Sequence, residues 1–428
     1  MKLKTLSTAI ILATVPMTGV FAAALDRSGQ SIAAFLQPGN YFEAGISVLD
    51  PNVSGKVRNG YTPNAAPPSV IGLENTNLSD MGDDYYFPSA ALKVQVTDNF
   101  SFGLIYDQPF GADATYSVAD KGSVAAGGVG LFHNGTESTS VEVKSQNISM
   151  LFGFQPTANW NIYAGPVYQT VKGDIKLRGL AYGGNDNFGG YNASIKETGD
   201  MGWLAGFAYQ IPEIALKASV TYRSEIEHSV VVKESSSAPL AANPGTLINQ
   251  NNGLGSTDIT TPQSVNLDLQ TGIMANTVAF ANVRWVNWKD FSIRPYAFGK
   301  ASVAAGASPT VNKPTGFDLV AYTDDQISAT VGVGRKLSEQ WAGNVSVGWD
   351  SGAGNPVSTL GPTEGYWNLG LGVQYSPTAQ TFIAGGVKYF WLGDAAAQPA
   401  SMFGTSKAIA DFEDNDALAY GLKIGYKF

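Results

Sequence analysis

The chain ends in Leu418-Ala-Tyr-Gly-Leu-Lys-Ile-Gly-Tyr-Lys-Phe428, where every even-numbered residue is leucine, isoleucine or aromatic and the residues between them are alanine, glycine or lysine. Such a period of two indicates a β-strand with one apolar face and one small or polar face. In bacterial outer-membrane barrels one strand face meets lipid and the other meets the lumen. The stretch therefore predicts the closing strand of an all-β transmembrane barrel, with Tyr426 and Phe428 as its barrel-assembly signal.

The first residues predict export. Met1–Lys4 is basic, Thr5–Phe21 carries no charge, and Ala22–Ala24 offers a small-residue cleavage site. Together they are typical of a secretory signal peptide, which we assign to residues 1–24. A retained membrane helix is the alternative, because the stretch is about long enough to span a bilayer, but Pro16 disfavours it.

Composition favours a barrel over a soluble exported protein. The 428 residues include 49 glycines, and only 14% of them are charged, whereas soluble proteins average about 25%. The mean hydropathy of -0.03 is nevertheless far below that of a helical membrane protein. A barrel explains both values, because only every second strand residue meets lipid.

Charge and cysteine content exclude some partners and chemistries. Without Lys2 and Lys4 the formal net charge of -9 becomes -11, because 24 basic residues remain against 35 acidic ones. Such a chain is a poor nucleic-acid binder, since phosphates are bound by Lys and Arg. Zero cysteines exclude disulfides and thiolate chemistry, so stability must come from the closed hydrogen-bond ladder.

Strand-like segments are joined in turn by long and tight connections from residue 40 onward. The tight links, such as Asp98-Asn99 and Pro156–Asn159, have turn chemistry or are too short for anything but a hairpin. Short periplasmic turns and long external loops are typical of an even-numbered antiparallel barrel. We predict a barrel of about fourteen strands over residues 40–428, with both ends in the periplasm. The predicted strands are 40–55, 86–97, 100–117, 140–155, 160–172, 201–210, 214–232, 263–273, 276–288, 325–336, 340–350, 365–375, 380–392 and 416–428.

The third predicted strand contains an interruption. Asp107-Gln-Pro-Phe-Gly-Ala-Asp113 lies where a ladder should be continuous, yet Pro109 has no N–H to donate and Gly111 relaxes the backbone. Either the strand kinks here, or it ends at Tyr106 and an external loop begins.

Two other strands carry less regular patterns. In the fourth strand the apolar residues are odd-numbered at first and even-numbered from Ile148, which predicts a bulge near Ser145–Asn147. The seventh strand predicts a lipid face that continues to Ile226. Its lumen face would then carry Arg223, Glu225 and Glu227.

Four segments of the chain resemble the outer-membrane long-chain fatty-acid transporter (FadL) family, which includes channels for toluene. These are Asn40–Gly55, Tyr86–Leu92, Ser101–Asp113 and Val220–His228, in the first, second, third and seventh predicted strands. The resemblance extends over essentially all of residues 25–428, and the four segments are fairly specific only in combination.

The resemblance implies a barrel plugged by an N-terminal hatch, here only residues 25–39. Family hatches run some tens of residues with an Asn-Pro-Ala turn, whose nearest match here is Gln37-Pro-Gly39. A short plug leaves the lumen more open unless the external loops fold in. The resemblance also implies passive uptake of hydrophobic small molecules, released sideways at the kinked third strand. The residues expected on that path are Phe35, Leu36, Phe42, Pro109, Phe110 and Gly111.

Basic lumen residues hold the carboxylate in fatty-acid transporters of this family. Arg223 matches the family pattern, and Lys172 is the nearest cation in the fifth predicted strand. We therefore name both as possible headgroup contacts. The alternative for Arg223 is an ion pair with Glu225 or Glu227, because lumen charges are commonly paired.

Enzymatic and metal chemistry find little support. A lipase-like triad needs Ser, His and an acid, but the chain has only His133 and His228. The acidic run Asp411–Asp416 lacks the glycine of a calcium loop, so we interpret it as a solvated loop bridged to lipopolysaccharide by divalent ions. We expect no catalytic residue, cofactor or metal.

The resulting hypothesis is a passive transporter in the bacterial outer membrane. Its expected partners are a hydrophobic ligand, outer-membrane lipid and lipopolysaccharide, and the barrel-assembly machinery, and we expect a monomer. The alternative is a general diffusion porin, whose lumen would be a water-filled channel. Apolar residues in the hatch and in the 233–262 loop favour the transporter.

Overall fold

A computed structural model describes residues 25–59, 72–237, 244–309 and 311–428. The predicted signal peptide, 1–24, lies outside the described residues. Within them, no helix is both long enough and apolar enough to cross a membrane.

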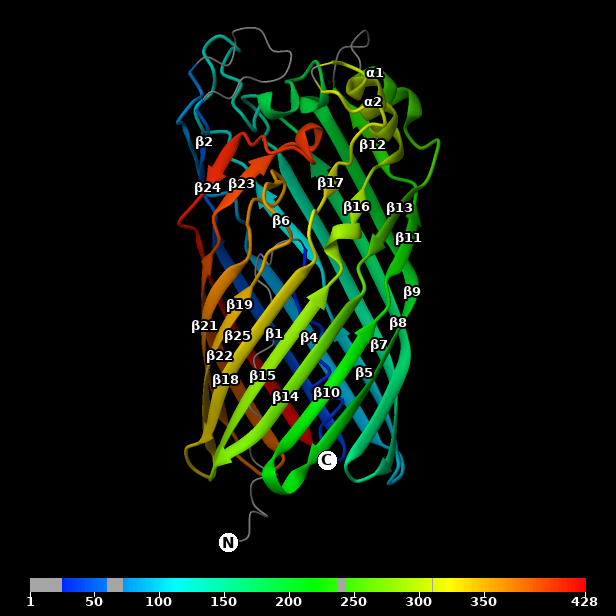
Figure 1. Ribbon diagram of the computed structural model, residues 1–428, viewed down its shortest axis with the longest axis vertical. Helices are drawn as coiled ribbons and strands as arrows, with labels where there is room; N and C mark the ends of the chain where they lie inside the picture. Colours follow the sequence, from blue (N-terminus) through cyan, green and yellow to red (C-terminus); the bar gives the residue numbers. More distant parts are fainter. Residues whose placement is uncertain (1–24, 60–71, 238–243, 310) are drawn as a thin grey trace.

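One closed antiparallel sheet forms the barrel wall (Figure 1). It contains sixteen strands, but β5 and β6 are two pieces of one wall strand and β12 is an extension beyond the wall, so the wall has fourteen strands. The number and order agree with the sequence prediction. The wall strands are β1 Tyr41–Asn52, β4 Tyr85–Gln95, β5 Phe100–Asp107 with β6 Gly111–Thr115, β7 Ser140–Thr157, β8 Trp160–Lys176, β9 Tyr191–Ile211, β10 Leu216–Arg223, β14 Ser264–Met274, β15 Thr277–Val286, β18 Gln326–Lys336, β19 Trp341–Asp350, β21 Tyr366–Tyr375, β22 Thr381–Leu392 and β25 Asp416–Lys427.

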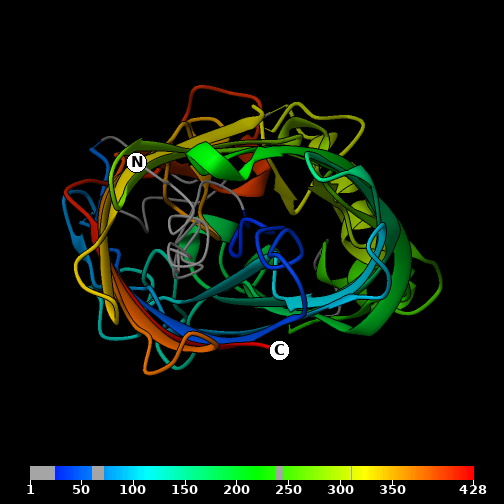
Figure 2. The ribbon, with the colours of Figure 1, turned by 90° about the horizontal axis from the view of Figure 1, so that it is seen from below.

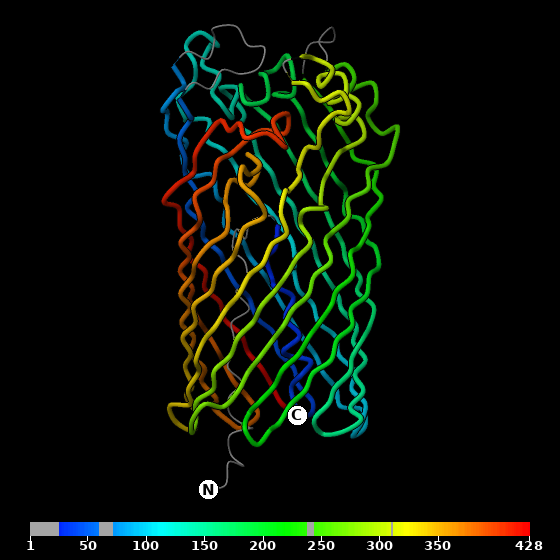
Figure 3. Tube along the Cα trace, viewed as in Figure 1, coloured from blue at the N-terminus to red at the C-terminus, as the bar shows by residue number. Residues whose placement is uncertain are grey.

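The last strand closes the barrel against the first. β25 pairs with β1 along its whole length, from Tyr41 opposite Lys427 to Asn52 opposite Asp416. The tube in Figure 3 shows tight turns at one end of the barrel and long connections at the other. Short turns face the periplasm in outer-membrane barrels, so both ends of the wall lie on that side.

The half of the barrel near the short turns, here called the membrane half, has an apolar outer surface. On β21, the outward side chains of Trp367, Leu369 and Leu371 are exposed, while glycines such as Gly370 and Gly372 alternate with them on the inner face. This is the pattern expected of a wall that contacts lipid.

The half near the long loops, here called the outer half, has the opposite polarity. On β7 and β8, Ile148 and Tyr168 lie opposite each other and are exposed, and four residues further on the exposed pair is Lys144 and Lys172. Beyond this point the apolar residues point inward, as the buried Ile175 does. The strands therefore extend beyond the membrane. In this part the apolar residues lie on the inward face of each strand, and the outward face is polar.

The predicted bulge near Ser145–Asn147 was wrong for this reason. The pairing of β7 with β8 is regular from Ser140 opposite Lys176 to Ser149 opposite Val167. The apolar residues change parity because the solvent outside the strand changes, and not because the strand changes register.

The seventh wall strand breaks instead. β10 ends at Arg223 and β11 (Ile226–Val230) begins after two residues that lie outside both strands, so the alternation shifts by one. Ile226 is buried and Glu227 is exposed. The prediction that Ile226 faces lipid and that Glu225 and Glu227 face the lumen was wrong.

Long loops carry small secondary elements that close the outer end of the barrel (Figure 1). They pack on the inward-facing apolar residues of the outer half in one large buried cluster, which includes Trp288, Phe298 and Tyr191. We call this layer the cap. Its elements are β2 Gly55–Val57, β3 Asn77–Leu78, β11, β12 Lys233–Ser236, β13 Thr257–Thr261, β16 Ser292–Ile293, β17 Val320–Ala321, β20 Val357–Ser358, β23 Ala395–Gln398, β24 Ala410–Phe412, α1 Gly245–Asn251 and α2 Tyr296–Gly306.

Candidate functional site

Residues 25–40 fold into a series of turns inside the barrel, seen in dark blue from below in Figure 2. An ion pair fixes their beginning to the wall: Arg284 Nε of β15 lies 2.7 Å from Asp26 Oδ2, and both side chains are almost completely buried. The same guanidinium donates to Gln30 Oε1 and to Asn266 Oδ1. Removing one partner of a buried ion pair costs about 3–5 kcal/mol because the other charge is left buried without compensation, so Asp26 and Arg284 depend on each other.

Phe35 anchors the other end of this segment. Its ring packs edge-on against Tyr163, and it lies so close to Gly103 and Gly153 of the wall that a Cβ at either would collide with it. Phe35 is 1% exposed, and Leu36 is buried in the same cluster. Phe35 and Leu36, two residues of the expected substrate path, therefore form the apolar core of the hatch.

The third wall strand kinks at the predicted position. Asp107 pairs with Asn147 of β7 and Gly111 pairs with Lys144, so three residues of the third strand lie opposite two of β7. The side chain of Ser145 fills the irregularity, because its Oγ accepts from the Phe110 N–H at 2.8 Å and donates to the Phe110 carbonyl at 2.7 Å. The kink is thus a bonded feature of the wall and not the start of a loop.

Backbone pairing within the wall is interrupted beside this kink. Pairing between β4 and the third strand stops at Ala90 opposite Tyr106, although β4 stays paired with β1 as far as Tyr85. Pro88 and Pro109 flank the unpaired stretch, one on each side, and proline is confined to such edges because it lacks an N–H. Residues Tyr85–Ser89 therefore border a gap between two wall strands.

The hatch supplies the hydrogen bonds that the wall lacks. Arg27 N–H donates to the Pro109 carbonyl at 2.6 Å, and Gly111 N–H donates to the Leu25 carbonyl at 2.8 Å. Further out, Thr115 N–H donates to the Met81 carbonyl at 2.9 Å. Beside the kink, the edge of the third strand is thus satisfied from the lumen and not by β4, and further out a bridge between Gly82 and Ala114 restores the pairing.

A cavity of about 80 Å³ lies at this gap. Its walls come from the hatch, from β4 and from the third strand, and we call it the gap cavity. The residues that line it include Arg27, Ser28, Phe87, Ser89, Tyr106 and Gln108.

A second cavity of about 30 Å³ lies beyond the hatch in the outer half, and we call it the outer cavity. Its lining is mainly apolar, and burial raises the pKa of the Tyr322 phenol, which keeps that side chain neutral. Arg27 lines both cavities and stacks on the Tyr85 ring with its guanidinium carbon 5.0 Å from the centroid. The apolar residues of the outer cavity are Leu25, Ala112, Ala114, Val141, Val143, Ile175, Ile293, Val320 and Leu360.

Three of the other predicted site residues lie elsewhere. Phe42 is 38% exposed on the outer, lipid-facing row of β1, and Lys172 is exposed on the outer face of β8. Even-numbered residues of both strands point outward, so neither side chain reaches the lumen. Arg223 does face the lumen, where it is buried, and its Nη1 has no hydrogen-bond partner in the described parts of the chain.

The comparison with known families agrees with this geometry. The model of the outer membrane protein transport protein family (OMPP1/FadL/TodX) matches residues 30–428. The chain belongs to the FadL/TodX family. It is therefore a transport protein of the bacterial outer membrane, and not an enzyme. None of the curated proteins compared with the chain matches it.

Solved structures of the FadL/TodX family share the fold at low sequence identity. A FadL homologue of Pseudomonas aeruginosa has a TM-score of 0.64 at 13% identity over 92% of each chain. The toluene transporter TodX of Pseudomonas putida has a TM-score of 0.58 at 13% identity over 96% of each chain. The toluene transporter TbuX of Ralstonia pickettii has a TM-score of 0.56 at 11% identity, with 99% of this chain and 100% of that chain covered.

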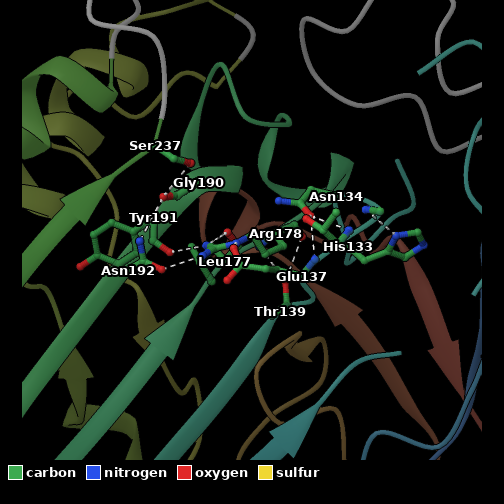
Figure 4. A network of polar contacts seen from close by, with 12 residues as sticks. His133, Asn134, Glu137, Thr139, Leu177, Arg178, Gly190, Tyr191, Asn192 and Ser237 are labelled. Atoms are coloured by element: carbon green, nitrogen blue, oxygen red, sulfur yellow. Dashed lines mark hydrogen bonds and ion pairs between the residues drawn. The ribbon is translucent and has the colours of Figure 1, made fainter. Parts of the chain in front are cut away.

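The cap of this family member is held by buried polar contacts. Arg178, after β8, donates to Glu137, to two backbone carbonyls and to Asn192, so that one guanidinium joins the loop before β7, the segment after β8 and the first residues of β9 (Figure 4). Glu234 of β12 accepts from the N–H groups of Ala297 and Phe298, the second and third residues of α2, at 2.7 Å each. Hydrogen bonds therefore hold together the cap segments that cover the outer cavity.

The acidic run Asp411–Asp416 belongs to the same layer. Asp411 forms a salt bridge with Arg58 of the segment after β2, and Asn415 is tied to Ser54 by hydrogen bonds in both directions. Part of this run is therefore used to hold cap segments together.

Proposed function

We propose that the protein carries hydrophobic small molecules through the outer membrane and releases them sideways into the lipid through the gap between β4 and the third strand. The observation that carries the proposal is the stretch Tyr86–Ser89 of β4, whose backbone has no ladder partner on the third strand and which lies next to a cavity inside the barrel. Unpaired backbone in such a wall is tolerated where it lines a cavity or an opening, and this stretch begins at the row of Tyr106 and Ile148, where the lipid-facing surface ends.

The lining of the outer cavity supports a mainly apolar ligand. Its walls offer aliphatic side chains, whereas an ion or a sugar would need polar groups to replace its water. The toluene transporters TodX and TbuX share this fold, so aromatic hydrocarbons and fatty acids are the ligands to test first.

Passage from one cavity to the other requires movement of the hatch. A cavity of roughly 150 Å³ holds one benzene molecule, and both cavities here are smaller. Arg27 lines both of them, so a ligand must displace it to reach the gap. The backbone bonds of Leu25 and Arg27 to the third strand would then break, and the opening would widen where those bonds had been.

Arg27 is the cation that lines both cavities, whereas Lys423 lines only the gap cavity and is paired there with Glu43. Arg223 lines neither cavity, and its nearest carboxylates are Asp107 and Asp268 of the wall. If a ligand has a carboxylate, we propose that Arg27 meets it first. Arg223 is the second position to test.

Closing the kink tests the proposal. The variant Pro109→Val/Gly111→Thr restores an N–H and strand propensity, and deletion of Gln108 alone removes the one residue by which the third strand exceeds β7 here. Either change should stop uptake of toluene and of a long-chain fatty acid by whole cells, while the barrel still resists cold SDS and shifts on boiling.

A wall glycine far from the gap provides the control. Gly343 of β19 has room for a Cβ, so Gly343→Thr should leave both folding and uptake intact. If a kink variant folds, reaches the outer membrane and transports at the parental rate, release occurs elsewhere. A large steady conductance in planar bilayers without hydrophobic uptake would favour a diffusion porin instead.

A further inference from the structure

Three exposed lysines form a row across neighbouring strands on the outside of the barrel. Lys144 of β7 lies directly opposite Lys172 of β8. On the other side, the register between β8 and β9 shifts after Val171, which places Lys172 opposite Lys196 and Glu197. The register of three strands thus brings these cations to one height on one face.

Two more lysines lie just beyond this row. Lys176 of β8 is opposite Asn192, and Lys233 of β12 is opposite Ser194. Lys144 is paired with Glu142, but none of the other four lysines forms an ion pair with a residue that the structure describes. We call the five residues the lysine patch: Lys144, Lys172, Lys176, Lys196 and Lys233.

The patch differs from the rest of the rim. It has four carboxylates as neighbours, Asp113, Glu142, Asp174 and Glu197, which leaves an excess of one positive charge. The whole chain has a formal net charge of -9. Outward positions at the tops of other wall strands carry Asp50 and Asp416 instead.

Like charges directly opposite each other destabilise a sheet. Lys144 and Lys172 are such a pair, and no carboxylate bridges them. An anion between the two ammonium groups would remove this repulsion, and phosphate is a group that lysine binds well as a point charge.

The height of the patch identifies the source of the phosphate. The last lipid-facing pair on these strands is Ile148 and Tyr168, four residues below Lys144 and Lys172. With about 3.3 Å per residue and a strand tilt near 40°, the row lies about 10 Å above the hydrocarbon boundary. In the outer leaflet of this membrane, that layer holds the phosphorylated sugars of lipopolysaccharide.

We infer that the lysine patch binds the phosphate groups of a lipopolysaccharide molecule held against β7, β8 and β9. Its acyl chains would lie on the apolar outer surface below, next to Ile148 and Tyr168. The site borders the kinked strand, because Lys144 is the partner of Gly111. This inference does not depend on the proposed release route, since it concerns only the outside of the wall.

Native mass spectrometry in mild detergent tests the inference with purified lipopolysaccharide as the probe. The variant Lys144→Gln/Lys172→Gln/Lys196→Gln should lose most of the bound lipopolysaccharide that the parent retains. The control Lys56→Gln/Lys121→Gln/Lys407→Gln makes the same change in net charge at exposed lysines of the cap and should retain it.

Two further arms identify the recognised group. Dephosphorylated lipopolysaccharide should bind the parent and the patch variant equally weakly, and 10 mM inorganic phosphate should not displace the intact lipid. If the patch variant folds poorly, Lys172→Glu alone should still lower binding, because it changes one exposed side chain. Binding of intact lipopolysaccharide to the patch variant at the parental level would overturn the inference, as would equal binding of the dephosphorylated lipid to the parent.

Discussion

The membrane half and the outer half of the barrel use the same strands with opposite polarity. In the membrane half, Leu369 and Leu371 of β21 point outward and glycines line the inside. In the outer half, Lys172 points outward and Ile175, three residues on, points into an apolar core. One strand can therefore pass from lipid into water without a change of register, because only the types of residue on its two faces change.

Deleting Phe428 should have the largest effect, because we expect this residue to be needed during assembly, before either half of the barrel has folded. Its ring is exposed on the membrane half and stacks on Tyr426 with centroids 5.8 Å apart. We propose that this pair is read by the barrel-assembly machinery. The deletion should sharply lower the yield of heat-modifiable barrel in the outer membrane, whereas Val124→Ser on the cap should not. Normal yield after the deletion would remove the proposed role.

The next largest effect is the difference in unfolding free energy when a positive charge is added to the outward face of each half. Val347→Arg places a cation on the lipid face of β19 and should cost about 2–4 kcal/mol near the bilayer centre. Gln146→Arg makes the same kind of change above the lipid-facing row of β7 and should stay within about 0.5 kcal/mol. Urea unfolding in lipid vesicles measures both. Equal losses would mean that the boundary between the halves is misplaced.

A hydroxyl group inside the outer half should weaken ligand binding without changing the shape of the outer cavity. Val143→Thr adds a polar group to the outer cavity, and burying it without a partner costs about 1–3 kcal/mol. We expect a loss of about five- to 150-fold in affinity for a neutral hydrocarbon, measured by calorimetry or by uptake at low concentration. Val373→Thr on the lipid face is the matched control. Unchanged affinity in Val143→Thr would place the binding site outside this cavity.

The last comparison distinguishes two cations by their effect on one class of ligand. Arg27→Gln should lower uptake of a long-chain fatty acid more than uptake of toluene, because a charge-assisted hydrogen bond contributes about 1.5–3 kcal/mol. Arg223→Gln should change both by the same factor, since Arg223 lines neither cavity. Selective loss of fatty-acid uptake in Arg223→Gln would transfer the headgroup contact to that residue.

Sequence alone predicted the wall because alternation is a local property. All fourteen strands were placed. The backbone chemistry of Pro109 and Gly111 left a kink and the start of a loop as alternatives, and the resemblance to the FadL family favoured the kink. The errors lie in the outer half. β9 begins at Tyr191 and not near residue 201, because its first residues are apolar on the inner side and polar outside. A period of two does not tell which face meets the lumen.

The residues of the site itself were harder to find. Asp26 and Arg284 are 258 positions apart, so only the closed barrel brings them together. Ser145 acts through its bonds to Phe110, and no pattern in its own strand indicates that role. Pro88 was the available signal, since a proline inside a predicted wall strand marks an unpaired edge.

The central claim is that hydrophobic ligands leave through the gap beside the kink. The chain has no cysteine, so a single Ser89→Cys provides a unique thiol in the gap cavity. Attachment of a bulky methanethiosulfonate reagent should stop toluene uptake, and a reductant should restore it. The same label at Thr330→Cys, on the inner face of β18 away from the gap, should leave uptake unchanged. Continued uptake with Ser89→Cys labelled, together with a block from Thr330→Cys, would contradict lateral release and show that ligands descend the lumen.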